Sequence, residues 1–178
     1  THIARVSGLL STLSEKRDNI LIVAGGGGGS YYERGSGYVG GSAGGYIGNN
    51  GLYNKRGVSY GGTQVSGGTN TDSSSYSGSF GKGGTNTNFS AGGGSGLYGG
   101  SAGGTDRTDD GDDYGTGAGG SGYIGNTLLT SKAMYCYNCT ASSEEATKTI
   151  STTCVNETAT ENCAKKGNGY AKITYLGE

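Results

Sequence analysis

The chain has 178 residues, of which 41 are glycine and only 31% are hydrophobic. It is therefore long enough for one domain but poor in the apolar side chains that a conventional core needs. Its 13 basic and 14 acidic residues give a net charge of −1, which argues against a nucleic-acid interface built on a basic face. Disorder is the simplest alternative for such a composition, but 14 tyrosines and recurring glycine phrases disfavour it.

The N-terminal residues predict conventional secondary structure. Residues 2–6 alternate between apolar and polar side chains, which is typical of a strand. Ser7 is suited to cap a short helical turn. In that turn Leu9, Leu10 and Leu13 are expected to share one face.

An apolar run then turns abruptly into glycine. Residues 20–24 predict a buried strand that continues directly into five glycines at 25–29. Similar glycine-rich phrases return at 37–48, 92–104 and 115–125, many of them as Gly-x-x-Gly units. Consecutive glycines form neither an ordinary helix nor an ordinary strand, because each loses much backbone entropy and packs no side chain.

Two architectures fit these phrases, and both are mainly β or irregular. Collagen is excluded because it needs glycine at every third residue and abundant proline, and this chain has no proline. Polyproline-II-type helices without side chains can pack side by side and satisfy one another's backbone groups. We favour such a polyglycine-II-like helix array, packed with a small β-sandwich, over glycine-rich loops and bulges on a β-sandwich alone.

Three polar insertions interrupt the glycine phrases at 52–66, 69–88 and 105–114, and they are expected to be surface loops. Tyrosines among Ser, Asn and Gly are typical of an adaptable recognition surface. The alternative is that some of them cover the glycine core. The candidate binding tyrosines in or beside the insertions are Tyr53, Tyr60, Tyr76, Tyr98 and Tyr114.

The third insertion is strongly acidic. Its candidate contact residues are Asp106, Asp109, Asp110, Asp112 and Asp113. Alternate spacing makes Asp106, Asp110 and Asp112 weak candidates for calcium ligands, but no glutamate stands at the twelfth position of the loop and no helices are expected to flank it. We therefore expect a solvated acidic loop, and no metal ion.

The last part of the chain differs in composition. We interpret residues 1–127 as the glycine-rich scaffold and residues 128–178 as a β tail that completes the same domain, with strands expected at 148–154 and 170–176. All four cysteines lie in this tail. A zinc site is disfavoured because only one pair has the C-x-x-C spacing. Two disulfides are expected, with the pairing left open, and they involve Cys136, Cys139, Cys154 and Cys163.

No catalytic set is visible. His2 is the only histidine, and nothing near it resembles the nucleophile of a hydrolase. The glycine phrases do not match a phosphate-binding loop, since no helix is expected after them. The sequence thus predicts a non-enzymatic protein without a cofactor or a membrane-spanning segment. It begins without methionine, as expected for a fragment.

The order of three phrases resembles a known family. They are Leu21-Ile-Val-Ala-Gly-Gly-Gly-Gly-Gly29, Gly119-Gly-Ser-Gly-Tyr-Ile-Gly125 and Gly167-Asn-Gly-Tyr-Ala-Lys-Ile-Thr174. The chain resembles the extracellular glycine-rich domain of the anaplastic lymphoma kinase and leukocyte tyrosine kinase receptors. This resemblance implies polyglycine-type helices beside a β-sandwich, and a domain that binds small helical protein ligands. The cysteine-containing tail departs from the receptor pattern, so ligand-contact residues are not carried over.

Two further resemblances concern display at a surface. The expected glycine array is similar to that of phage tail-fibre tip adhesins. Residues 132–139 resemble a phrase of glycine-rich surface proteins of gut Firmicutes, some of them on pilin-like stems. We therefore expect a bacterial, extracellular, surface-displayed adhesion module, with a host-surface protein or glycan as its partner. The alternatives are a pilin-like subunit that binds identical copies in a filament, and a receptor ectodomain fragment that binds a protein ligand.

Overall fold

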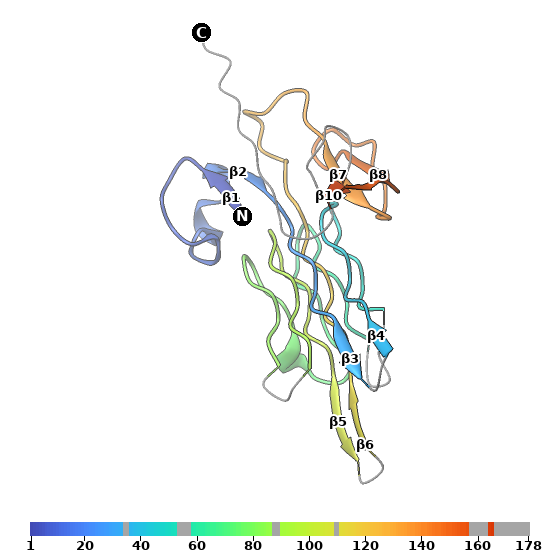
Figure 1. Cartoon of the computed structure of the whole chain (residues 1–178). Coiled ribbons are helices and arrows are strands. Elements are labelled where there is room, and N and C mark those ends of the chain that lie inside the picture. Colours follow the sequence, from blue (N-terminus) through green and yellow to red (C-terminus); the bar gives the residue numbers. More distant parts are fainter. Residues whose placement is uncertain (34–35, 53–57, 87–89, 109–110, 157–163, 166–178) are drawn as a thin grey trace.

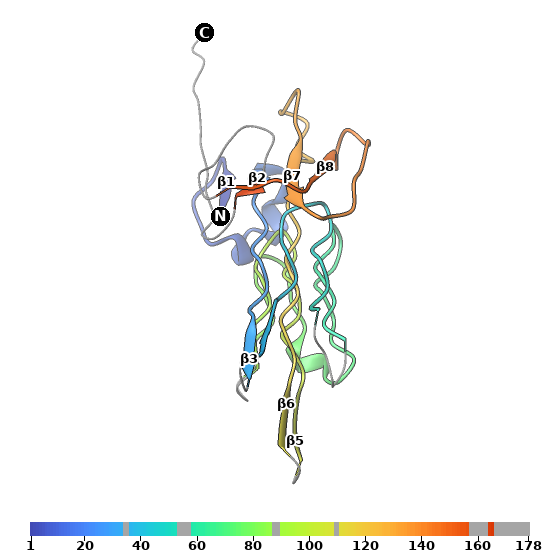
Figure 2. The same cartoon turned by 45° about the vertical axis from the view of Figure 1, so that its right-hand side comes forward.

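Glycine-rich segments run back and forth along the long axis of the molecule (Figure 1). Short strands and 3₁₀ turns lie at the two ends of these segments (Figures 1 and 2). The computed structural model describes residues 1–33, 36–52, 58–86, 90–108, 111–156 and 164–165.

One end, named here the disulfide end, carries two strand pairs. β1 (His2–Ala4) and β2 (Ile20–Val23) are antiparallel, with a register shift between Ile3 and Ala4, whereas β7 (Met134–Tyr137) and β8 (Thr149–Thr152) are parallel. A small parallel pair, β9 (Val155–Asn156) with β10 (Ala164–Lys165), follows along the chain. Two 3₁₀ helices lie between β1 and β2 in the sequence, η1 (Leu10–Thr12) and η2 (Ser14–Asn19).

The opposite end, named here the hairpin end, carries two antiparallel hairpins and one 3₁₀ turn (Figures 1 and 2). All strands in the described part of the chain form two-stranded sheets. The expected β-sandwich stays a prediction, because residues 170–176 lie outside the described ranges. The elements of this end are β3 (Tyr31–Glu33), β4 (Ser36–Tyr38), η3 (Ser74–Tyr76), β5 (Thr105–Thr108) and β6 (Gly111–Tyr114).

Residues 115–123, the central glycine segment, connect their neighbours by backbone hydrogen bonds with a period of three residues. Every third N–H donates to one neighbouring segment: Gly115 to Gly104 at 2.8 Å, Ala118 to Ser101 at 2.9 Å and Ser121 to Tyr98 at 3.0 Å. A second set donates to another segment: Gly117 to Gly29 at 3.0 Å, Gly120 to Gly26 at 2.9 Å and Tyr123 to Val23 at 2.9 Å. Successive residues therefore bond on different sides, as expected for a backbone with three residues per turn.

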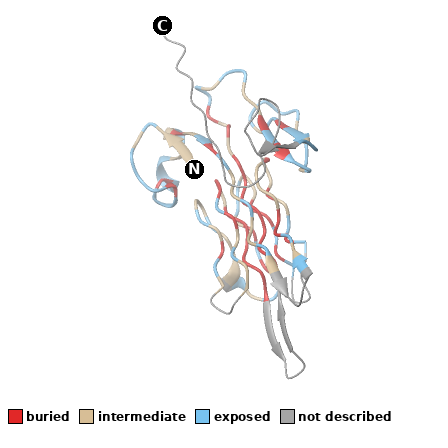
Figure 3. Cartoon of the chain, viewed as in Figure 1, coloured by how far each residue is buried: buried red, intermediate tan, exposed pale blue. Residues whose placement is uncertain are grey.

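The same segment also accepts hydrogen bonds at this interval. The N–H groups of Ala91, Gly94 and Leu97 donate to the carbonyl oxygens of Gly115, Ala118 and Ser121 at 3.4, 2.8 and 2.8 Å. Residues 115–122 are all buried, and buried residues line the inside of the bundle (Figure 3). The backbone groups of this interior are thus paired with neighbouring segments, as buried N–H and C=O groups require.

Most of the glycines are needed because the segments approach closely. Among the described glycines only Gly8, Gly44 and Gly81 have positive φ. At most other positions a Cβ would collide with backbone, as at Gly117, where it would lie under 3.0 Å from the carbonyl group of Gly92. A side chain at one of these positions would therefore push the segments apart and break the hydrogen bonds between them.

A small apolar core lies at the disulfide end. It contains Leu10, Leu13, Ile20, Val23 and Leu97, with Phe80, Tyr98 and Tyr123 packed against it. The predicted strands at 2–6 and 20–24 are confirmed in shorter form as β1 and β2. The core lies at the ends of several glycine segments and holds those ends in place.

The predicted helical turn is only partly correct. Leu10 and Leu13 are buried as expected, but Leu9 is 73% exposed. The turn is 3₁₀, with three residues per turn, so positions 10 and 13 lie above one another and position 9 does not. Leu9 is also the N-cap and has no side-chain cap bond, so the expected Ser7 cap is wrong.

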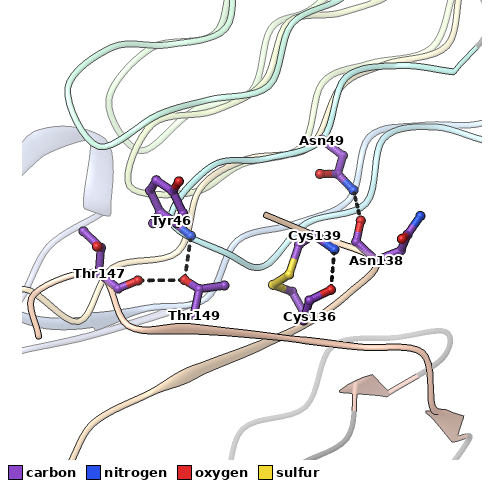
Figure 4. The surroundings of a disulfide bond; sticks show 8 residues. Tyr46, Asn49, Cys136, Asn138, Cys139, Thr147 and Thr149 are labelled. Atoms are coloured by element: carbon purple, nitrogen blue, oxygen red, sulfur yellow. Dashed lines mark hydrogen bonds between the residues drawn. A yellow bond between two sulfur atoms is a disulfide. The ribbon is translucent and has the colours of Figure 1, made fainter. Parts of the chain in front are cut away.

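The tail contacts the glycine segments at a disulfide that lies within the tail itself (Figure 4). Cys136 and Cys139 are bonded to each other, and Cys136 packs against Gly44 and Gly45. Hydrogen bonds flank this contact, from the Tyr46 N–H to Thr149 Oγ1 at 3.3 Å and from Asn49 Nδ2 to the Asn138 carbonyl at 3.1 Å. Cys154 is also disulfide-bonded, and Cys163 lies outside the described residues.

A matched pair of alanine substitutions tests the close approach of the segments. Gly117→Ala should destabilise the domain by about 1–3 kcal/mol or more, because the new methyl group meets backbone that cannot move independently. Gly27→Ala should be neutral or slightly stabilising, since its Cβ would lie 3.7 Å from the nearest backbone oxygen. Urea unfolding of both variants provides the comparison, and equal losses would contradict the packing argument.

The disulfide offers a second test. Replacing both Cys136 and Cys139 by serine should lower stability by about 2 kcal/mol, from the chain-entropy estimate for a short closed loop. Limited proteolysis should then cut the tail before the glycine segments, because Cys136 is part of the contact between them. Cleavage of both parts at the same rate would show that the disulfide does not hold the tail.

Candidate functional site

The candidate site is the hairpin end, where the structure places the β3–β4 hairpin, the 3₁₀ turn η3 and the β5–β6 hairpin. Glycine segments that run to this end are followed by segments that run back. The turns at the disulfide end are tight, for example the Thr63–Ser66 turn, which is closed by a 2.9 Å backbone hydrogen bond. Figures 1 and 2 agree in placing β3, β5, β6 and η3 at the same end. The described residues of this end include 30–33, 36–39, 52, 58, 71–77, 90, 105–108 and 111–114.

Small polar side chains fix the bases of these connections. Asn70 is 6% exposed and Ser59 is fully buried. The Asn70 side-chain amide donates to the Ala102 carbonyl at 2.8 Å and to Ser59 Oγ at 3.3 Å. One buried amide thus joins connections that start from three different segments.

The acidic hairpin is held in a similar way. The Ser90 hydroxyl lies 3.0 Å from the Gly104 carbonyl and 2.8 Å from the Gly115 carbonyl, with its proton shared between them. The Gly115 N–H in turn donates to Ser90 Oγ at 3.2 Å. Asn86 Nδ2 donates to the Gly103 carbonyl at 2.8 Å. The two strands of the hairpin therefore leave the scaffold from a fixed position.

The third insertion, expected to be a surface loop, forms the antiparallel β5–β6 hairpin. Its register pairs Asp106 with Asp113 and Arg107 with Asp112. Because directly paired positions share a face and neighbouring pairs alternate, positions 106 and 112 are on opposite faces of the ladder. The weak calcium candidacy of Asp106 and Asp112 stays a prediction, because their side chains lie outside the described part of the chain. Asp109 and Asp110 lie outside the described residues, and the acidic contact residues remain predictions.

A shallow apolar depression of about 240 Å³ lies beside β3 and β4. Tyr31 and Tyr38 face each other across the hairpin, and together with Val39, which is 63% exposed, they line the depression. Two more apolar side chains of this end are open to solvent, Leu52 at 75% and Val58 at 39% exposure. Exposed aromatic and aliphatic groups above a polar scaffold are typical of protein interfaces.

The candidate tyrosines are not brought together. Tyr98 packs at the disulfide end, where its ring lies 5.3 Å from that of Phe80 in an edge-on arrangement. Tyr60 is 41% exposed, and Tyr76 lies in η3 at the hairpin end. Tyr53 is outside the described residues, as is the side chain of Tyr114. Tyr98 therefore fits the alternative that some tyrosines cover the core.

Sequence reasoning did not identify Asn70, Ser59 and Ser90 as anchors. Each of them looks like an ordinary loop residue, and its burial depends on segments distant in sequence.

No group of three or more His, Cys, Asp or Glu side chains in the described residues is placed to hold a metal ion. None of the helices in those ranges is long and apolar enough to cross a membrane.

These features define a glycine-rich scaffold domain with two hairpins and a 3₁₀ turn gathered at one end. A family model for the glycine-rich domain of the anaplastic lymphoma kinase and leukocyte tyrosine kinase receptors matches residues 5–176. The chain belongs to this family, and in the receptors the domain is extracellular and separate from the kinase. No curated protein and no solved structure matches the chain significantly.

Removing one anchor tests how the connections are held. Asn70→Ala should destabilise the domain by about 1–3 kcal/mol, because it leaves the buried Ala102 carbonyl with a weaker partner. Thr85→Ala, an exposed change at the same end, should fall within about 0.5 kcal/mol of the parent. Hydrogen exchange at residues 58–60 and 69–72 should increase in the first variant alone; protection equal to that of the parent would show that Asn70 is not an anchor.

Proposed function

We propose that the chain is a non-catalytic, extracellular recognition module whose hairpin end contacts a partner molecule. The observation that carries this proposal is the gathering of two hairpins and a 3₁₀ turn at one end, on bases fixed by polar side chains. Membership of an extracellular receptor-domain family supports the location. Display at a cell surface and the absence of enzymatic activity are part of the proposal.

The scaffold that we propose is a polyglycine-II-type helix array. Three features support it: backbone hydrogen bonds at three-residue intervals, glycines that mostly avoid positive φ, and Cβ positions occupied by neighbouring backbone. Such an array has little freedom to bend, because every segment is bonded on several sides. A rigid support lowers the entropy that the connections lose on binding.

The partner that this surface fits is a protein or glycan on another cell. The Tyr31 and Tyr38 depression offers aromatic area, which suits both the apolar face of a sugar ring and a side chain of a protein ligand. Exposed Leu52 and Val58 extend the apolar area. Adhesion to a host surface and binding of a receptor ligand are two biological uses of the same contact surface.

A shortened hairpin tests the proposal. The intact domain, made tetravalent, is screened on an array of host-type glycans and on a panel of extracellular proteins. Replacing residues 106–113 with two glycines should abolish any hit and leave thermal unfolding unchanged, since the Ser90 anchor is retained.

Two exposed apolar residues provide a matched control. Leu52 at the hairpin end and Val65 at the disulfide end are 75% and 77% exposed. Leu52→Ser should weaken binding and Val65→Ser should not, while neither affects folding. Binding that survives both hairpin-end changes would overturn the proposed site. Failure to bind any surface, together with concentration-dependent filament growth, would replace it with the filament alternative.

A further inference from the structure

A polar pocket lies at the disulfide end, away from the hairpin end. It has a volume of about 370 Å³, and Arg5, Asp18, Tyr123, Asn126 and Leu128 are among the residues that line it. This size falls near the lower end of small-molecule sites, which are about 300–1,000 Å³. The pocket is not used by the proposed function, and the inference does not rest on that function.

One wall of the pocket is fixed by Asn126, which is 6% exposed. Its Nδ2 donates to the main-chain carbonyls of Asp18 at 2.9 Å and Ile20 at 2.8 Å. Its Oδ1 accepts from the Leu128 N–H at 2.9 Å. The wall is therefore preformed and joins the N-terminal region to the irregular segment that follows the central glycine segment.

Three cations surround this wall. Arg5 lines the pocket, Lys132 Nζ donates to the Asn126 carbonyl at 2.9 Å, and the Arg17 guanidinium lies 5.3 Å from the centroid of the Tyr123 ring. Asp18 is the only carboxylate among the lining residues. The local charge is thus positive in a chain whose net charge is −1.

Donors remain available for a ligand. A guanidinium has five N–H donors and an ammonium has three, whereas Arg17 uses one on the Gln64 carbonyl and Lys132 one on Asn126. Among the described residues, Arg5 and Lys132 form no ion pair with a carboxylate. Arginine donors beside an aromatic ring are well suited to carboxylate, sulfate or phosphate groups.

We propose that this pocket binds a small anionic ligand, either the acidic group of a carbohydrate or a free inorganic oxyanion. Arg5 makes the direct contact, Tyr123 provides the surface on which the ligand rests, and Lys132 and Arg17 add to the positive field. The exposed position of Arg5 makes the attraction sensitive to salt.

The test uses the intact domain at low ionic strength. Inorganic phosphate and N-acetylneuraminic acid are titrated separately, with neutral N-acetylglucosamine as the control, and amide chemical shifts are followed. Shifts at residues 5, 18 and 123–128 with both anions, and competition between them, would assign an acidic sugar. Shifts with phosphate alone would assign a free oxyanion. Absence of shifts with both anions, or equal shifts with the neutral sugar, would overturn the proposal.

Removing a positive charge and removing a negative charge should change the affinity in opposite directions, and this separates an effect on binding from an effect on folding. Arg5→Gln should weaken binding about tenfold and Lys132→Gln by a smaller factor, whereas Lys148→Gln, an exposed change elsewhere, should leave it unchanged. Asp18→Asn should strengthen binding several-fold, because it removes the opposing charge and keeps the main-chain carbonyl that Asn126 uses. Damage to the fold cannot strengthen binding, so unchanged affinity in both Arg5→Gln and Asp18→Asn would exclude the site.

Discussion

The hydrogen bonds between neighbouring glycine segments determine the rest of the structure. They form only when backbones approach so closely that a Cβ at positions such as Gly61 or Gly117 would meet the next carbonyl group. Because each segment bonds on several sides with a period of three residues, it provides an interior without large side chains. This explains how a chain that is only 31% hydrophobic buries residues 115–122.

The two ends of the glycine segments have different physical roles. At the disulfide end, aliphatic side chains, the Cys136–Cys139 bond and the Asn126 wall hold the bends together. At the hairpin end, the contacts at the bases of the connections are made by small polar side chains. This difference between the two ends is the reason why we propose recognition at the hairpin end.

The sequence was informative where structure depends on local pattern. Alternating or apolar runs predicted β1, β2 and β8. The cysteine spacing favoured disulfides over zinc but left the pairing open, and the structure joins Cys136 to Cys139. The glycine phrases favoured packed backbones over glycine-rich loops, because packed segments satisfy one another's N–H and C=O groups. Sequence reasoning failed where distant segments decide the outcome. The Asn70 side chain is bonded to the Ala102 carbonyl, 32 residues away, and Tyr98 packs against Phe80 rather than in a loop.

The three-residue period has a consequence for how such a chain tolerates change in length. One residue inserted within the central glycine segment would rotate every later N–H by a third of a turn and direct it toward the wrong neighbour. An insertion of any length beyond the Ser59, Asn70 or Ser90 anchors leaves this phase intact. Length variation is thus confined to the tips of the connections, and a family built on this scaffold can diversify its surface without redesigning its interior.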